Sequence, residues 1–155
     1  MQITDIYPEE LQKKIADGYQ LALKMVPMPS DLNPAGDVFG GWVLSNVDVA
    51  GAIPAVKRSR GRVATVAFNS FKFNHPIQVG DLVCFFTKII KEGITSMTIE
   101  VLVTAQRRFN FKSMKFDTSE ILESTLVTDA IVTYVCMDEN GQKRALPPLS
   151  STDTL

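Results

Sequence analysis

Hydrophobic residues along the chain follow two periods, and the change between them falls near residue 60. Residues 38–57 are apolar at nearly every helical position, which predicts a long helix that is apolar on all sides and therefore buried. Asp37 stands where a helix cap is expected. Beyond this segment the apolar residues alternate with polar ones, and four runs predict β-strands: 62–73, 82–91, 94–106 and 126–137.

The remaining segments complete one domain. Pro8 and Gly18 bracket a short N-terminal helix, and the apolar run at 19–26 predicts a first strand. The stretch 27–41 is a long loop rich in Pro and Gly, and such loops within a domain are often functional. We expect a polar, poorly patterned insert and a domain with two extensions, bounded as follows: insert 109–124, N-terminal helical extension 1–18, single domain 19–147, loose C-terminal tail 148–155.

These elements predict an α+β fold in which one long central helix is wrapped by a curved antiparallel sheet of about five strands. The connections at 76–81 and 92–93 are short, which favours antiparallel neighbours. A single curved sheet covers a helix on one side only and leaves its own edges open. We therefore expect at least a homodimer.

The composition limits which ligands and catalytic groups the chain can use. The 155 residues include 16 basic and 17 acidic side chains, and a net charge of -1 argues against a nucleic-acid binder. One His and two Cys argue against a zinc site, so we expect no metal. With a single His, a Ser-His-Asp triad or a Cys-His dyad is possible only if His75 is the catalytic base. We expect His75 to be a loop residue instead. Carboxylates, amides, hydroxyls and backbone groups must then do the chemistry.

The sequence also predicts the compartment. Residues 1–20 are too acidic and too weakly apolar for a signal peptide. The longest apolar stretch, 47–56, is too short for a bilayer and is interrupted by Asp48 and Pro54. Cys84 and Cys136 are expected to be buried, reduced thiols rather than a disulfide. We therefore expect a cytoplasmic protein without a membrane partner.

Asp48 is the strongest chemical candidate. An isolated carboxylate within the most apolar segment is costly unless it has a partner, which leaves a structural hydrogen bond, a tie across subunits or a function. Gly40 and Gly41 begin the predicted helix, where unpaired N–H groups suit a developing oxyanion. Gly41 and Asp48 share a helix face but lie about 10.5 Å apart along the axis. Two helices packed antiparallel across a dimer axis would bring Asp48 of one subunit to Gly41 of the other.

The segment MPSDLNPAGDVFGGWVLSNVDVAGA at 28–52 resembles the signature loop and helix of hotdog-fold acyl-CoA thioesterases, particularly the bacterial YciA-like short-chain group. The resemblance continues through three further motifs: GRVATV at 61–66, FNHPIQVGD at 73–81 and ALP at 145–147. It implies a hotdog fold and hydrolysis of acyl-CoA thioesters without a metal or other cofactor. It also implies a dimer of hotdogs, assembled into a hexamer as a trimer of dimers.

The resemblance assigns roles to residues by position. Asp48 matches the catalytic carboxylate, Gly41 the helix-start backbone donor, and Asn33 the loop amide that positions the thioester or the attacking water. Phe39 and Trp42, on either side of Gly40 and Gly41, would flank the acyl and pantetheine slots, although core packing is equally open to Trp42. Phe39 stands where related thioesterases often have His, so a His-assisted mechanism is not expected.

Two departures from the family pattern are visible. Pro54 sits where the family's helix continues, and it is expected to remove a hydrogen bond to Ala50 and to kink the helix. His75 replaces a basic residue that is common before the Pro of its loop.

Coenzyme A is polyanionic, and two basic clusters could hold its phosphates. One comprises Lys57, Arg58, Arg60 and Arg62, and the other comprises Arg107 and Arg108. We select Arg60, Arg62 and Arg107 as candidate coenzyme ligands, with an ordinary solvated surface as the alternative. Three functions then compete: an acyl-CoA thioesterase acting on short to medium chains, a non-catalytic acyl-CoA sensor, and a dehydratase or hydratase. The last would need a His-containing acid/base pair.

Overall fold

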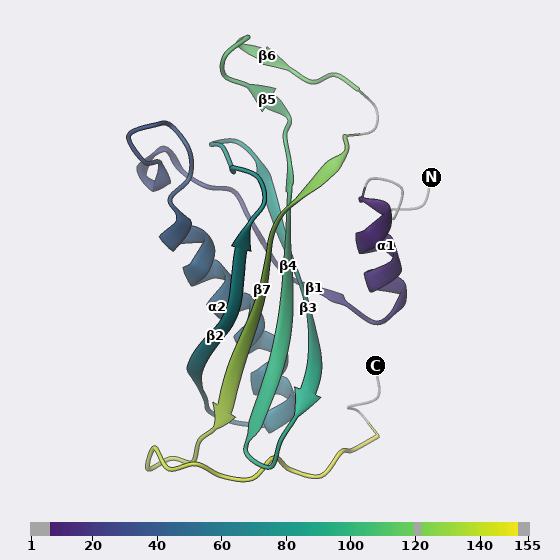
Figure 1. The fold of residues 1–155 in the computed structure, drawn as a ribbon, viewed down its shortest axis with the longest axis vertical. Helices are drawn as coiled ribbons and strands as arrows, with labels where there is room; N and C mark the ends of the chain where they lie inside the picture. Colours follow the sequence, from purple (N-terminus) through teal and green to yellow (C-terminus); the bar gives the residue numbers. More distant parts are fainter. Residues whose placement is uncertain (1–6, 120–121, 152–155) are drawn as a thin grey trace.

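A computed structural model of the chain describes residues 7–119 and 122–151 (Figure 1). It contains two α-helices, a short 3-10 helix and seven strands. In chain order they are α1 (Glu9–Ala16), β1 (Gln20–Met25), η2 (Pro29–Asp31), α2 (Gly40–Ser59), β2 (Val63–Phe73), β3 (Leu82–Glu92), β4 (Ser96–Gln106), β5 (Phe109–Asn110), β6 (Lys115–Phe116) and β7 (Ser124–Cys136).

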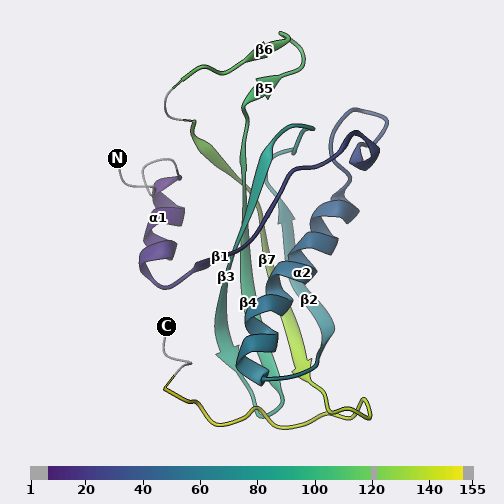
Figure 2. The same ribbon diagram turned by 180° about the vertical axis from the view of Figure 1, so that it is seen from behind.

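Five strands form one antiparallel sheet in the order β1-β3-β4-β7-β2, and α2 packs along one face of it (Figure 2). This arrangement confirms the predicted α+β fold with one long helix on a five-stranded sheet. Strands β1 and β2 stand at the edges, so each has one side without a strand neighbour in the described part of the chain. The edge at β2 is the one closest in sequence to the end of α2.

The core lies between α2 and the sheet, and strand alternation builds it. On β3, Val83 and Phe85 point to the α2 side and are fully buried. Cys84 and Phe86 point to the opposite face and join a second, smaller cluster. Val47 of α2 is also fully buried against the first cluster. The predicted strands are therefore present in the predicted alternation.

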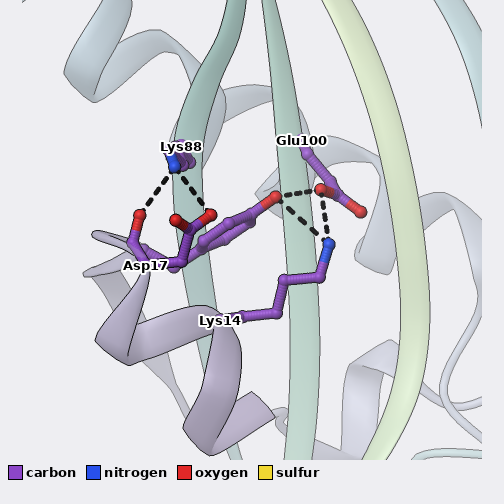
Figure 3. Close-up of polar contacts among 5 residues, drawn as sticks. Lys14, Asp17, Lys88 and Glu100 are labelled. Atoms are coloured by element: carbon purple, nitrogen blue, oxygen red, sulfur yellow. Dashed lines mark hydrogen bonds and ion pairs between the residues drawn. The ribbon is translucent and has the colours of Figure 1, made fainter. Parts of the chain in front are cut away.

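Helix α1 covers the second face of the sheet, on the side away from α2 (Figure 2). Leu11 is buried there against Tyr19 and Phe86. The Tyr19 hydroxyl and the Lys14 ammonium both donate to Glu100 on β4, the latter at 3.3 Å (Figure 3). Burial, followed by this carboxylate, raises the pKa of Tyr19, so the phenol stays a donor.

A second ion pair holds the end of α1. Lys88 of β3 lies 2.9 Å from the carboxylate of Asp17 and donates to its backbone oxygen (Figure 3). The N-terminal helix predicted from Pro8 and Gly18 is thus present and docked, although residues 1–6 lie outside the described part. The proposed division of the chain into extension, domain and tail stays a prediction.

Helix α2 differs from the prediction at both ends. It begins at Gly40 with Phe39 as its N-cap residue and no side-chain cap, so the expectation for Asp37 was wrong. Asp37 instead bonds Asn33 through its backbone N–H and C=O. The helix runs through Pro54 to Ser59 and ends at Arg60 in the left-handed conformation.

One side of α2 is uncovered in a single chain, as expected for a helix that one curved sheet covers on one side only. Four large apolar side chains of the helix are exposed: Leu44 at 39%, Val49 at 53%, Ile53 at 46% and Val56 at 46%. The sheet covers only one side of the helix, so its apolar pattern needs a second protein surface.

Within the segment 109–124, expected to be poorly patterned, residues 109–116 form a small hairpin of β5 and β6 beyond the end of the main sheet, and residues 120–121 lie outside the described part (Figure 1). The rings of Phe111 and Phe116 lie 4.6 and 4.7 Å from that of Phe109, measured between centroids. Aromatic packing therefore organises this hairpin.

Cys84 and Cys136 are both buried and free, as predicted. Of the predicted loose tail, residues 152–155 lie outside the described part. Arg58 donates to the backbone oxygen of Pro147 at 2.7 Å, just before that tail. No helix in residues 7–119 and 122–151 has an apolar run long enough to cross a membrane.

Candidate active site

The loop before α2 is shaped by Asn33. Its Oδ1 accepts hydrogen bonds from the backbone N–H groups of Ala35 at 2.9 Å and Asp37 at 3.1 Å. The side-chain oxygen is thereby used to fold the loop. Its Nδ2 is then the part of Asn33 available to donate to a ligand, which agrees with the predicted role of a positioning amide and does not test it.

The start of α2 is open to a ligand at Gly41. Apart from its chain neighbours and the nearby helix backbone, no heavy atom lies within 4 Å of the position a Cβ would take at Gly41, whereas at Gly40 the ring of Phe73 lies 3.0 Å from that position. The first N–H groups of a helix have no intrahelical acceptor and carry the positive end of the dipole. Gly41 therefore presents a backbone donor on an uncovered surface.

Asp48 is half-buried and held by two hydroxyl groups. Thr65 of β2 donates to Oδ1 at 2.6 Å. Tyr134 of β7 donates to the backbone oxygen of Asp48 at 2.7 Å and lies 3.3 Å from Oδ1. Burial, followed by the Asp48 charge, raises the pKa of Tyr134, so the phenol stays a donor.

Thr65 and Tyr134 were missed by the sequence reasoning. They are direct partners in the β2–β7 ladder, so both side chains project from the same face of the sheet toward α2. A polar Thr and a Tyr within two strand patterns give no local sign of this role. Only the adjacency of β2 and β7, which are far apart in the chain, brings them to Asp48.

Gly51 makes room for Tyr134, which gives a first prediction. A Cβ at Gly51 would overlap the Tyr134 hydroxyl oxygen. We expect Gly51→Ala to lower the free energy of unfolding by about 1–3 kcal/mol, because overpacking outweighs the gain in helix propensity. Urea denaturation measures this. In a Tyr134→Phe background the cost of Gly51→Ala should shrink, and an equal cost in both backgrounds would contradict the steric explanation.

A single chain does not bring Asp48 and Gly41 together. Both lie on α2, seven residues apart and about 10.5 Å along the axis. The exposed residues Val49, Ile53 and Val56 lie on the neighbouring side of the helix, about 80–140° round its axis from Asp48. One protomer thus supplies the parts of a site without assembling them.

An open cavity of about 380 Å³ lies beside the helix start. Its wall is mainly apolar, with Val38, Val43, Phe73 and Ile77 among the lining residues, together with Gly40. Phe39 and Trp42, expected beside the acyl and pantetheine slots, are not part of this wall. Phe39 is 49% exposed.

Trp42 is half-buried and packs against the core. Its ring centroid lies 6.5 Å from that of Phe85. This is the core packing that was left open for Trp42 at the sequence level, and a contact with substrate stays a prediction.

The predicted basic residues have different surroundings. Arg60 and Arg62 are exposed at the end of α2. Arg58, between them and the core, is buried and pairs with both carboxylate oxygens of Glu92, at 2.8 and 3.0 Å. Arg107 donates through Nε at 3.0 Å and Nη2 at 2.9 Å to the carboxylate of Asp81.

His75 is an exposed loop residue after β2, as expected. Its backbone N–H bonds the Val127 oxygen at 3.3 Å. Within the described part of the chain, His75 makes no hydrogen bond or ion pair with Asp48 or Gly41.

A long helix packed on a five-stranded antiparallel sheet is the architecture of the hotdog fold. The family model described as the thioesterase superfamily matches residues 35–108. A Haemophilus influenzae protein named as an uncharacterized acyl-CoA thioester hydrolase is 42% identical over 82% of this chain and 77% of its own length. The YciA acyl-CoA thioester hydrolase of Escherichia coli K12 is 37% identical over 82% of this chain and 90% of its own length.

Two solved structures of thioesterases are also similar to this chain in sequence and fold. A mutant form of HI0827, described as a hexameric broad specificity acyl-coenzyme A thioesterase, is 40% identical with a TM-score of 0.76, covering 86% of this chain and 91% of its own. Cj0915 of Campylobacter jejuni, described as a hexameric hotdog fold thioesterase, is 41% identical with a TM-score of 0.74, covering 83% and 90%. The chain therefore belongs to the thioesterase superfamily, and within it to the YciA-like acyl-CoA thioester hydrolases.

Proposed function

We propose that this protein hydrolyses short- to medium-chain acyl-CoA to a fatty acid and coenzyme A, with Asp48 as general base or nucleophile and the Gly41 N–H as oxyanion donor. The reaction uses the chain's own groups and neither a metal nor another cofactor. The observation that carries the proposal is a half-buried, anchored carboxylate on the same helix face as an open backbone donor.

The reaction balances with these groups alone. As a base, Asp48 takes a proton from water while the water oxygen bonds to the thioester carbonyl carbon. The carbonyl oxygen becomes an oxyanion that accepts a hydrogen bond from the Gly41 N–H. The C–S bond then breaks, and the coenzyme A thiolate receives the proton from Asp48. As a nucleophile, Asp48 would instead attack the carbonyl carbon, and the C–S bond would break to release the coenzyme A thiolate and leave an acyl anhydride. Water would then hydrolyse the anhydride to the fatty acid and free Asp48, and the proton released would go to the thiolate. The Nδ2 group of Asn33 would orient the thioester or the water.

A homodimer with antiparallel α2 helices would complete the site. The exposed apolar side of α2 and the free edge of β2 supply a surface for the partner. Arg60 is nineteen residues from Gly41, about 28 Å along the helix. The antiparallel partner would therefore bring its own Arg60 and Arg62 toward the Gly41 end, where the phosphates of coenzyme A could bind. The hexameric relatives support a trimer of such dimers.

A panel of acyl-CoA thioesters of increasing chain length tests the function. We expect release of free thiol with short and medium chains, at a rate unchanged by a chelator. The open cavity beside Gly40, with its apolar wall, is the slot we assign to the acyl chain. Binding of acyl-CoA without thiol release would contradict the proposal and favour a sensor module.

Mixed dimers test whether the site is shared. We expect Asp48→Asn and Gly41→Val to be inactive when each is made alone. A dimer of the two has one intact site and one site with both changes, and random pairing makes half of the dimers mixed. Co-refolding equal amounts should thus restore about a quarter of the wild-type rate. No recovery, with dimers confirmed by analytical ultracentrifugation, would show that both groups act from the same chain.

A further inference from the structure

A second open cavity, of about 560 Å³, lies near the end of α2, away from the helix start. It is bounded by the last turns of the helix, the second half of β3 and the connection between α1 and β1. The chain leaves α1 through Gly18, in the left-handed region with a φ of 96°, and β1 then begins at Gln20, opposite Thr87. On the β1 side, the edge of β3 at 88–92 therefore has no strand neighbour among the described residues, and the cavity opens beside it.

The wall of this cavity carries more cations than carboxylates. Both of its carboxylates are already paired with cations: Asp17 with Lys88 at 2.9 Å (Figure 3), and Glu92 with Arg58 at 2.8 and 3.0 Å. The ammonium groups of two further lining residues, Lys57 and Lys91, have no hydrogen bond or ion pair within residues 7–119 and 122–151. Two positive charges are thus left without a partner there, which favours an anionic ligand.

The same wall also has an apolar part. Pro54 of α2, Ile89 and Ile90 of β3, and Leu149 all line the cavity. Ile90 is 44% exposed and Leu149 69% exposed, so both offer apolar surface to a ligand. No aromatic residue of the described ranges lines the cavity, so it offers no ring on which the adenine of a nucleotide could stack. Cations together with aliphatic surface suit an anion that carries a hydrocarbon chain.

This cavity is separate from the site around Asp48. Lys57 follows Asp48 by nine residues on α2, which places the two residues on opposite sides of the helix, about 180° apart. The Asp48 carboxylate is bonded by Thr65 of β2, at one edge of the sheet. The cavity lies beside β1 and β3, at the other edge.

We propose that this cavity binds a free fatty acid, with its carboxylate paired with Lys57 and Lys91 and its hydrocarbon chain against Pro54, Ile89 and Leu149. A fatty acid is the product of the proposed reaction, so the choice of ligand rests on the proposed function. Because the cavity is separate from the catalytic groups, a fatty acid binds there while a thioester occupies the catalytic site.

Calorimetric titration with decanoate tests the site. The titration is made with a saturating acyl-CoA analogue in which a thioether replaces the thioester, so that the catalytic site is filled by a ligand that cannot be hydrolysed. We expect one decanoate to bind per chain under these conditions. Acetate, which has the charge without the chain, and decanol, which has the chain without the charge, should each bind at least about tenfold more weakly.

A double variant, Lys57→Met with Lys91→Met, removes both unpaired charges and keeps apolar side chains of similar length. We expect it to bind decanoate about 10- to 50-fold more weakly, because two partly exposed ion pairs are lost. Lys112→Met is the matched control. It removes the same charge from an exposed residue in the hairpin of β5 and β6, at the opposite end of the molecule from the end of α2 (Figure 1), and should keep the wild-type affinity.

The outcomes separate this inference from the proposed function. No decanoate binding beside the analogue, or equal binding by the wild type and the double variant, would overturn the fatty-acid site and leave the proposed function standing. Tighter binding of adenosine diphosphate than of decanoate would also overturn it, as would a changed oligomeric state of the double variant in sedimentation, which would assign the cavity to a subunit contact. If decanoate binds as expected but no acyl-CoA releases thiol, the proposed function fails and the fatty-acid site stands.

Discussion

We expect Asp48→Asn to lower acyl-CoA hydrolysis by about 100- to 10,000-fold, the usual cost of removing a general base or nucleophile. Asn keeps an Oδ1 that can accept the Thr65 hydroxyl, and Tyr134 bonds the backbone oxygen, which the substitution leaves in place. The variant should therefore fold and assemble as wild type. Its amide group can neither take a proton from water nor attack the thioester. Thiol release from a short-chain acyl-CoA measures the loss.

The matched control is Glu139→Gln, which makes the same chemical change at an exposed turn after β7. It should keep full activity. Circular dichroism and sedimentation of both variants confirm that fold and assembly are unchanged, and calorimetry checks that Asp48→Asn still binds coenzyme A. Undiminished thiol release from a folded Asp48→Asn variant would remove Asp48 from the mechanism.

The five main strands and the long helix could be predicted because their signals are local. Strand β4 alternates between buried and less buried residues at its start, and the apolar density of α2 distinguishes a long helix from everything else in the chain. The same density predicts a helix that must be covered on every side, which is more than one sheet provides. The apolar composition indicates that every side of the helix must be buried. It does not indicate whether the same chain or a second subunit buries each side.

The helix start was misplaced for a related reason. Asp37 is a good cap by residue type, but Asn33 binds its backbone N–H, and Phe39 occupies the cap position. The hydrogen bond from the Asp37 backbone to the Asn33 side chain therefore outweighs the capping preference of Asp37. The hairpin of β5 and β6 escaped notice because its strands have only two residues each and its order comes from the rings of Phe109, Phe111 and Phe116.

For the site, the residues within one continuous motif could be predicted and those supplied by distant strands could not. Asp48 and Gly41 stand out on the helix by type and spacing. Thr65 and Tyr134 become partners of Asp48 only when β2 lies beside β7, a pairing that closes a long loop of chain. A buried Tyr hydroxyl needs a hydrogen-bond partner, but the sequence does not indicate which residue supplies it.

Arg107 is paired differently from either role considered at the sequence level, a coenzyme A ligand or an ordinary solvated residue. The sequence offered it as a ligand for coenzyme A phosphates, and the structure pairs it with Asp81. The carboxylate of Asp81 is fully buried and accepts two bonds from Arg107 and one from the backbone N–H of Gln78 at 2.9 Å. This hydrogen bonding to Asp81, the largest contribution, raises the pKa of Arg107. The ion pair joins the end of β4 to the turn before β3.

Arg107→Met should therefore act on stability. We expect the free energy of unfolding to fall by about 2–3 kcal/mol, because the variant leaves a buried carboxylate without its cation, and the 42% exposure of the Arg107 side chain keeps the loss below that of a fully buried pair. Arg108→Met removes the same charge from the next, exposed residue and should cost less than about 0.5 kcal/mol. Urea denaturation measures both. In the thioesterase assay at a temperature where Arg107→Met is folded, KM should match wild type. A large rise in KM with unchanged stability would instead assign Arg107 to the coenzyme, with Asp81 orienting it toward the phosphates.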